Sequence, residues 1–199
     1  MNNTEKKIEI KIGGFGGQGI ILAGLIVGKA ASIFDEKHAC LIKSYGPEAR
    51  GGSCNTQVII AKTPVLYPYV IVPDVLVILS QEAYYRFGPE INTNGVLLHE
   101  KDLIKLEPKP KTSHVFSIPA TQLAEELGKK VVTNIVMLGF FASISGAVSK
   151  PAMTKAIEST VPKGTLELNI AAFEKGYEYG LIQLQSQSEY KPIGNKFGE

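Results

Sequence analysis

Two short glycine-rich strings hold the residues of this chain whose types and spacing suit binding of a charged ligand. The first reads Gly14-Phe15-Gly16-Gly17-Gln18-Gly19 and opens an apolar stretch typical of a helix. Glycine permits positive φ and close backbone approach, and the amides of a helix's first turn carry partial positive charge. The string therefore indicates an anion-binding turn. Tight packing of a strand against a helix also selects glycine, so a purely structural turn is the alternative.

The second string reads Ser44-Tyr45-Gly46-Pro47-Glu48-Ala49-Arg50-Gly51-Gly52-Ser53. Its glycines and proline force turns at both ends, which leaves Glu48 and Arg50 displayed between them. The arginine fork suits a phosphate, a carboxylate or an acidic side chain of a partner. A surface turn with a weak local ion pair is the structural alternative. The candidate binding residues of this string are Ser44, Tyr45, Gly46, Glu48, Arg50, Gly51 and Gly52.

The expected second strand argues against a dinucleotide cofactor. A dinucleotide-binding fold places an Asp or Glu about 20 residues after the glycines, where it holds the ribose hydroxyls. This strand, at residues 38–44, ends with Lys43 and Ser44, and no carboxylate stands at its end. A nicotinamide or flavin dinucleotide is therefore disfavoured.

The elements that position these strings follow an alternating pattern of strands and helices. Strands are expected at residues 9–13, 39–43, 54–61, 75–80, 96–99 and 114–118, and helices at 19–34, 81–87, 121–127, 151–159 and 166–184. This pattern predicts an α/β fold, a Rossmann-like layered domain with a mostly parallel or mixed sheet and additional C-terminal helices. Residues 1–184 form the expected domain. Residues 185–199 are expected to be a polar tail, either mobile or ordered on a partner.

One long segment, residues 131–149, has no charged residue. Its length approaches that of a membrane span, but polar residues and glycines dilute it, so a buried helix of a soluble protein is favoured. Thr133 and Asn134 are expected to cap this helix, which would begin at about Ile135. Because apolar residues cover nearly every side of it, one face is expected to pack against another subunit.

Composition excludes several functions. The chain has 199 residues, 44% hydrophobic and 20% charged, and a net charge of +2, which predicts a soluble globular protein with no nucleic-acid or membrane partner. Cys40 and Cys54 are too few for an iron–sulfur cluster, and reduced thiols in a cytoplasmic protein are favoured. The three histidines lack metal-ligand spacing, so no metal is expected. No catalytic residue is assigned, because neither a nucleophile elbow nor a Walker lysine is present.

Taken together, the two strings resemble those of the gamma subunit of 2-oxoacid:ferredoxin oxidoreductases, over about residues 8–184. The Pro-Glu-Ala-Arg-Gly-Gly form is more similar to the 2-oxoglutarate type than to the pyruvate type. This resemblance implies a complex that oxidatively decarboxylates a 2-oxoacid to acyl-CoA, CO2 and reduced ferredoxin. It also implies alpha, beta and ferredoxin-like delta subunits as partners, which carry thiamine diphosphate and iron–sulfur clusters, with ferredoxin as the electron acceptor.

The resemblance further implies that this chain binds no cofactor alone and is not catalytic alone. Gly14, Phe15, Gly16, Gly17, Gln18 and Gly19 would form one side of a site, and the loop around Arg50 would form the other. Their expected task is to hold part of coenzyme A or to close over the thiamine site of a neighbouring subunit. Two alternatives stay open: a stand-alone nucleotide-binding enzyme of Rossmann type, and a purely structural subunit.

Overall fold

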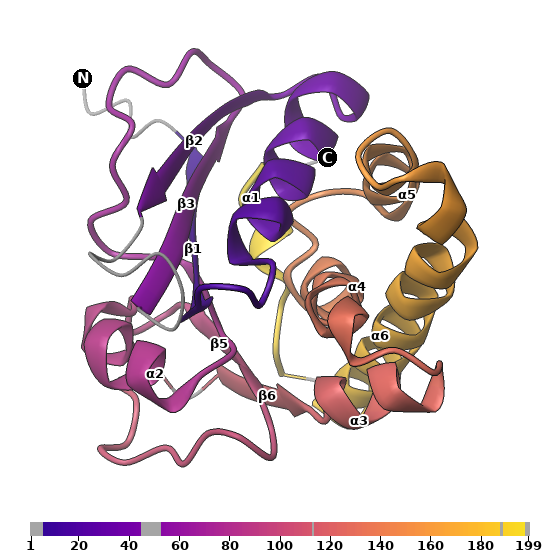
Figure 1. Ribbon diagram of the computed structural model, residues 1–199. Coiled ribbons are helices and arrows are strands. Elements are labelled where there is room, and N and C mark those ends of the chain that lie inside the picture. Colours follow the sequence, from indigo (N-terminus) through magenta and orange to yellow (C-terminus); the bar gives the residue numbers. More distant parts are fainter. Residues whose placement is uncertain (1–5, 45–52, 113, 188, 198–199) are drawn as a thin grey trace, which may run out of the picture.

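The computed structural model describes residues 6–44, 53–112, 114–187 and 189–197. Six strands form one sheet in the order β2-β3-β1-β4-β5-β6 (Figure 1). Their bounds are Lys7–Phe15 for β1, His38–Ser44 for β2, Ser53–Ala61 for β3, Val75–Ile78 for β4, Val96–Glu100 for β5 and His114–Ile118 for β6. These are the six strands expected from the sequence, with ends that differ by up to two residues.

The sheet is mixed. Strands β1, β4, β5 and β6 run parallel to one another, whereas β3 is antiparallel to both β1 and β2. Strand β1 shows why the sequence folds this way, because its side chains alternate between the two faces of the sheet. Ile8, Ile10 and Ile12 belong to the larger core, while Glu9 and Lys11 point to the opposite face.

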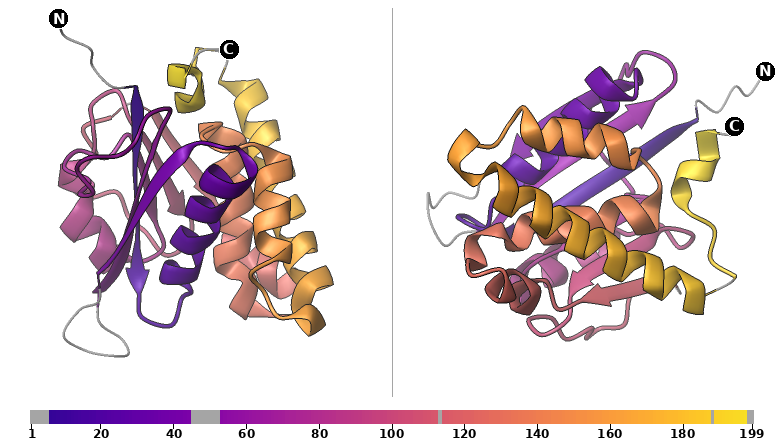
Figure 2. Two further views of the ribbon diagram at one scale, coloured as in Figure 1. Left: turned by 90° about the horizontal axis from the view of Figure 1, so that it is seen from above. Right: turned by 90° about the vertical axis from the view of Figure 1, so that its right-hand side faces the viewer.

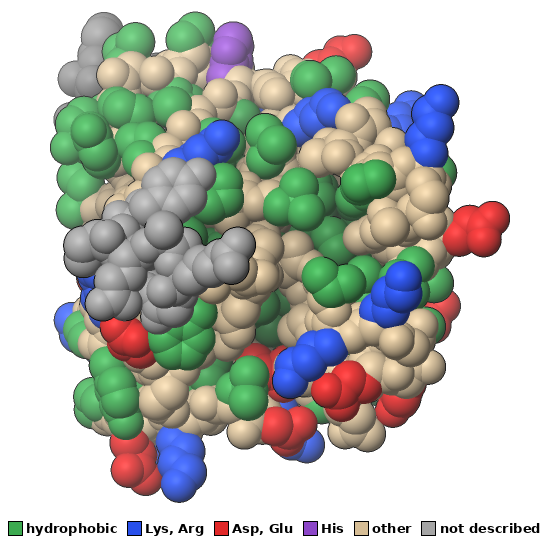
Figure 3. All heavy atoms as spheres, viewed as in Figure 1, with side chains coloured by type: hydrophobic (Ala, Val, Ile, Leu, Met, Phe, Trp, Pro, Cys, Tyr) green, Lys and Arg blue, Asp and Glu red, His purple; other side chains and the backbone are tan. Residues whose placement is uncertain are grey.

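Helices cover the two faces of the sheet unequally (Figures 1 and 2). One face carries α1 (Ile20–Lys29), α3 (Ala120–Glu126), α4 (Thr133–Ser145), α5 (Lys150–Glu158) and α6 (Leu166–Ser186). A π-helical turn, Ala30–Phe34, continues α1, and short 3-10 turns lie at Gly88–Glu90, Lys130–Val132, Lys163–Thr165 and Ile193–Phe197. Among the described residues, the opposite face carries α2 (Gln81–Phe87), its 3-10 extension and irregular segments. Figure 3 shows the molecule in the view of Figure 1, with hydrophobic side chains spread among polar and charged ones.

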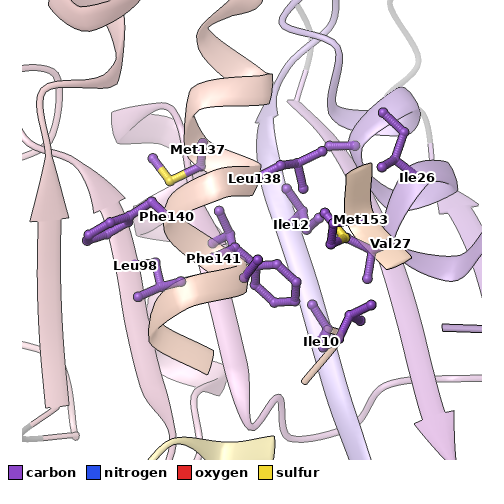
Figure 4. Close-up of a cluster of buried hydrophobic side chains, with 14 of the residues drawn as sticks. Ile10, Ile12, Ile26, Val27, Leu98, Met137, Leu138, Phe140, Phe141 and Met153 are labelled. Carbon is purple, nitrogen blue, oxygen red and sulfur yellow. The ribbon is translucent and has the colours of Figure 1, made fainter. Parts of the chain in front are cut away.

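Two hydrophobic cores result from this layering. The larger core lies between the sheet and α1, α4, α5 and α6. Figure 4 shows Leu138 and Phe141 of α4 beside Ile10 and Ile12 of β1. The smaller core joins α2 to the other face through Tyr84 and Phe87. No helix in the described part of the chain is long and apolar enough to cross a membrane.

Helix α4 corrects one expectation from the sequence. Every residue from Asn134 to Ser145 is buried within this chain, so no apolar face is left for another subunit. The reason is α6, which crosses α4 at very short range through glycines on both helices. A Cβ at Gly176 of α6 would lie 1.9 Å from the carbonyl oxygen of Val136. Within α6, Phe173 is buried and Ala171 is exposed.

The C-terminal residues correct a second expectation. Tyr190, Ile193 and Phe197 are buried in the larger core, and Lys196 Nζ lies 2.6 Å from Asp74 Oδ1. Residues 189–197 therefore pack on their own chain and are neither a mobile tail nor an arm held by a partner. The segment is polar on average, but its three apolar side chains have a site on the sheet. The division of the chain at residue 184 stays a prediction.

Candidate functional site

The first glycine-rich string forms the turn between β1 and α1. Gly19 is the N-cap of α1 with φ of 72°, and Gly17 has φ of 101°, so both positions favour glycine. Gln18 fixes the turn. Its Oε1 accepts a hydrogen bond from Phe15 N at 2.7 Å, and its Nε2 donates to Leu79 O at 3.1 Å. The glutamine side chain thus ties the end of β1 to the residue that follows β4.

The second string starts and ends at the end of the sheet where β1 finishes. Ser44, the last residue of β2, pairs with Asn55, and Ser53, the first residue of β3, pairs with Phe15. Antiparallel pairing of β3 with both neighbours therefore brings the two strings to one edge. The other candidate residues of this string lie outside the described residues: Tyr45, Gly46, Glu48, Arg50, Gly51 and Gly52. Their contact with a ligand stays a prediction.

Two cavities lie on either side of the turn. The first, of about 250 Å³, is lined by residues from the starts of three helices: Gly19 at α1, Asn134 at α4 and Asn169 at α6. The second, of about 210 Å³, is lined by Gln18, Leu79, Thr121 and Lys130. Gly17 and Val131 line both cavities. A Cβ at Gly17 would meet no atom within 4 Å, so this residue borders open space.

The electrostatics of the first cavity favour an anion. Helices α1, α4 and α6 begin at its wall, and the amides of a helix start carry partial positive charge. The exposed Lys129 adds a cation at its rim. Most of the remaining lining is apolar, with Leu22, Val161 and Leu168 among it. The cavity therefore suits a ligand that has both an anionic group and an apolar part.

Asn134 is a residue of this site that the sequence analysis did not find. It was expected to cap α4, but the helix begins at Thr133 and has no side-chain cap. Asn134 is 4% exposed; its Nδ2 donates to Gly19 O at 3.3 Å, and its Oδ1 has no partner among the described residues. A buried acceptor without a partner costs about 1–3 kcal/mol. The available signal was a side-chain amide within a segment that has no charged residue.

A buried carboxyl group supports the second cavity. Glu100, at the end of β5, is fully buried, and burial raises its pKa above the usual value for glutamate. Its Oε2 accepts hydrogen bonds from Thr121 N at 2.9 Å and Thr121 Oγ1 at 3.2 Å. Glu100 thereby positions Thr121, which lines the cavity. The described residues contain no cluster of three or more His, Cys, Asp or Glu side chains that could hold a metal ion.

Comparison with known proteins decides the family. Residues 9–179 match the model of the pyruvate ferredoxin/flavodoxin oxidoreductases. The chain belongs to this family. It is 48% identical over 182 residues to the 2-oxoglutarate synthase subunit KorC of Methanocaldococcus jannaschii, which covers 89% of this chain and 97% of that relative. The resemblance seen in the two strings, to gamma subunits of 2-oxoacid:ferredoxin oxidoreductases, is confirmed.

A solved structure confirms the fold class. The gamma subunit of a keto/oxoacid ferredoxin oxidoreductase from Geobacter sulfurreducens is 41% identical, with a TM-score of 0.78 over 88% of this chain and 99% of that chain. A longer relative is the ketoisovalerate oxidoreductase subunit VorA of Methanothermobacter thermautotrophicus. It is 28% identical over 91% of this chain, which spans 38% of its length. In VorA this fold is therefore one part of a larger polypeptide.

Proposed function

We propose that this chain is the gamma subunit of a 2-oxoglutarate:ferredoxin oxidoreductase and that it contributes to coenzyme A binding in the assembled enzyme. The substrate is inferred from the similarity of this chain to proteins named as 2-oxoglutarate synthase subunits. Thiamine diphosphate and the iron–sulfur clusters belong to the alpha, beta and ferredoxin-like delta subunits in this proposal. The complex forms the acyl-CoA and CO2 and passes the electrons to ferredoxin.

The observation that carries the coenzyme A role is the pairing of Phe15 with Ser53. It places the ends of the Arg50 loop beside the turn at Gly17 and Gly19, where the cavities open. Coenzyme A combines phosphates with an apolar arm that carries amides. The helix starts and Lys129 at the rim of the cavity suit the phosphates, and the aliphatic side chains inside it suit the arm. In this proposal Arg50, which lies between Ser44 and Ser53 in the sequence, supplies a second cation.

The test uses the reconstituted complex and measures turnover against the concentration of coenzyme A. Arg50→Ala should raise the KM for coenzyme A at least tenfold, because an arginine fork that binds a phosphate is lost. The KM for 2-oxoglutarate should stay within twofold. Arg86→Ala is the matched control, since Arg86 is exposed on α2, on the other face of the sheet.

Lys129 gives a second test within the described residues. Lys129→Ala should raise the KM for coenzyme A about threefold to tenfold, with Lys155→Ala, an exposed lysine of α5, as its control. Unchanged coenzyme A kinetics in Arg50→Ala and Lys129→Ala, with the complex intact, would favour the purely structural subunit. Reduction of NAD by the isolated chain with its own substrate would favour the stand-alone enzyme instead.

A further inference from the structure

The segment of residues 62–74, between β3 and β4, exposes an unusual row of large apolar side chains. Leu66, Tyr67, Tyr69, Ile71 and Val72 have exposed fractions from 46% to 84%. Residues 63–73 include no charged residue. The segment lies on the face of the sheet that carries α2, away from the other helices (Figure 2). Soluble chains rarely leave so many large apolar groups together in water, unless another molecule covers them.

The backbone of this segment is held in place by side chains from the sheet. Glu9 of β1 is 7% exposed, and its Oε2 accepts hydrogen bonds from Ile71 N at 3.1 Å and Val72 N at 3.3 Å. Gln57 Oε1, on β3, accepts from Val70 N at 2.9 Å. A buried carboxylate thus stabilises the main chain at the very residues whose side chains face outward. The interactions fix the backbone while Leu66, Ile71 and Val72 stay exposed.

The end of the segment is anchored as well. Glu9 N donates to Asp74 Oδ2 at 3.0 Å, and Asp74 N donates to Glu9 O at 2.7 Å. Lys196 donates to the other carboxylate oxygen of Asp74 at 2.6 Å. Pro64, Pro68 and Pro73 restrict the backbone further. A surface ordered in advance loses little entropy on binding, so these features favour a role in association.

We propose that residues 62–74 form the surface on which this chain docks to the subunit that corresponds to the remaining part of VorA. The proposal rests on the proposed function only in that this chain is one subunit of a complex. VorA carries this fold as 38% of its length, so in VorA the fold is covalently linked to the rest of the polypeptide. Where this fold is a separate chain, non-covalent contacts would have to replace that covalent link. Tyrosines, large aliphatic groups and a lack of charge are typical of the core of such an interface.

The probe is the polypeptide from the same genome that matches the remaining part of VorA, co-expressed with this chain and purified through a tag on the probe. Leu66→Asp and Ile71→Asp should each weaken the association at least 100-fold, measured by biolayer interferometry, because each places a charge in an apolar contact. Ile182→Asp is the matched control. Ile182 is 67% exposed on α6, and this variant should bind like the wild type.

Folding is checked separately, since both replaced side chains are exposed in the isolated chain. The variants should keep the wild-type far-ultraviolet circular dichroism spectrum and thermal midpoint. Wild-type affinity in folded Leu66→Asp and Ile71→Asp would overturn the proposal. It is also overturned if the isolated chain is a dimer that either variant converts to a monomer, because a second copy then covers the segment.

The readout does not involve coenzyme A, so the two proposals can fail independently. Unchanged coenzyme A kinetics in Arg50→Ala, together with lost association in Leu66→Asp, would remove the coenzyme A role and leave the docking surface. Failure of the wild-type chain to bind the probe would overturn the docking surface and leave the coenzyme A role to its own test.

Discussion

Gly139 of α4 lies against the main chain of Phe173 in α6, so closely that a Cβ at residue 139 would be 2.0 Å from the Phe173 carbonyl oxygen. Gly176 of α6 makes the reciprocal approach to Val136 of α4. The two helices therefore touch through their backbones, and a side chain at either glycine would force them apart. This contact is the reason that α4 is buried within its own chain.

Gly139→Ala and Gly176→Ala should each lower the free energy of unfolding by about 1–3 kcal/mol, because the added methyl group overpacks a rigid helix contact. Urea denaturation measured by circular dichroism tests this expectation. Gly164→Ala is the control, since a Cβ there meets no atom within 4 Å and its φ is not positive. A wild-type midpoint for Gly139→Ala would contradict the close crossing.

His99 should give the stability of this protein a pH dependence. Burial is the main cause that lowers the pKa of His99 below its ordinary value of 6.5, and a hydrogen bond to Glu100 O opposes that shift in part. As the pH falls below 6.5, the unfolded chain binds a proton at this residue before the folded chain does. Stability from His99 is therefore present above pH 6.5 and is lost as the pH falls toward the lowered pKa.

The measurement compares the wild type with His99→Gln between pH 7.5 and pH 4.5. The difference in unfolding free energy should change in this window by at most about 1.4 kcal/mol per pH unit, the limit for one proton. His38→Gln, which replaces an exposed ring, should reproduce the wild-type profile. If the unfolding free energies of His99→Gln and of the wild type changed with pH in the same way, the buried ring would not contribute to the pH dependence.

Removal of the C-terminal residues should destabilise the domain. A chain that ends at Ser186 loses Tyr190, Ile193 and Phe197 from the larger core, and each buried side chain of this size stabilises by about 1.5–3 kcal/mol. We expect a loss of at least about 3 kcal/mol by urea denaturation, together with faster limited proteolysis. Phe197→Ala should reproduce part of the loss, and Lys191→Ala, an exposed change, should not. An unchanged urea midpoint for the shortened chain would restore the interpretation of a free tail.

Local patterns in the sequence were sufficient for most elements of the fold. The isoleucines of β1 alternate with Glu9 and Lys11, and the run at residues 75–79 is apolar throughout, so both strands are apparent from hydrophobicity alone. The two glycine-rich strings also pointed to one site, and the register of β3 places the ends of both at one edge. The contacts of Arg50 stay a prediction.

The errors arose from contacts between residues distant in sequence. The apolar surface of α4 was correctly recognised, but sequence periodicity does not say whether α6 or a second protein covers it. The glycines at 139 and 176 were the available signal, since they mark a close approach that no local pattern required. Asn134 was misread for the same reason, because its partner, Gly19 O, lies 115 residues away.

The hairpin of β2 and β3 fixes both ends of the segment that joins the two strands. Backbone pairing runs without interruption from His38 and Ala61 to Ser44 and Asn55, so the intervening loop leaves and re-enters the sheet at fixed points. Replacement of residues 45–52 by another segment of the same length should therefore leave this pairing intact.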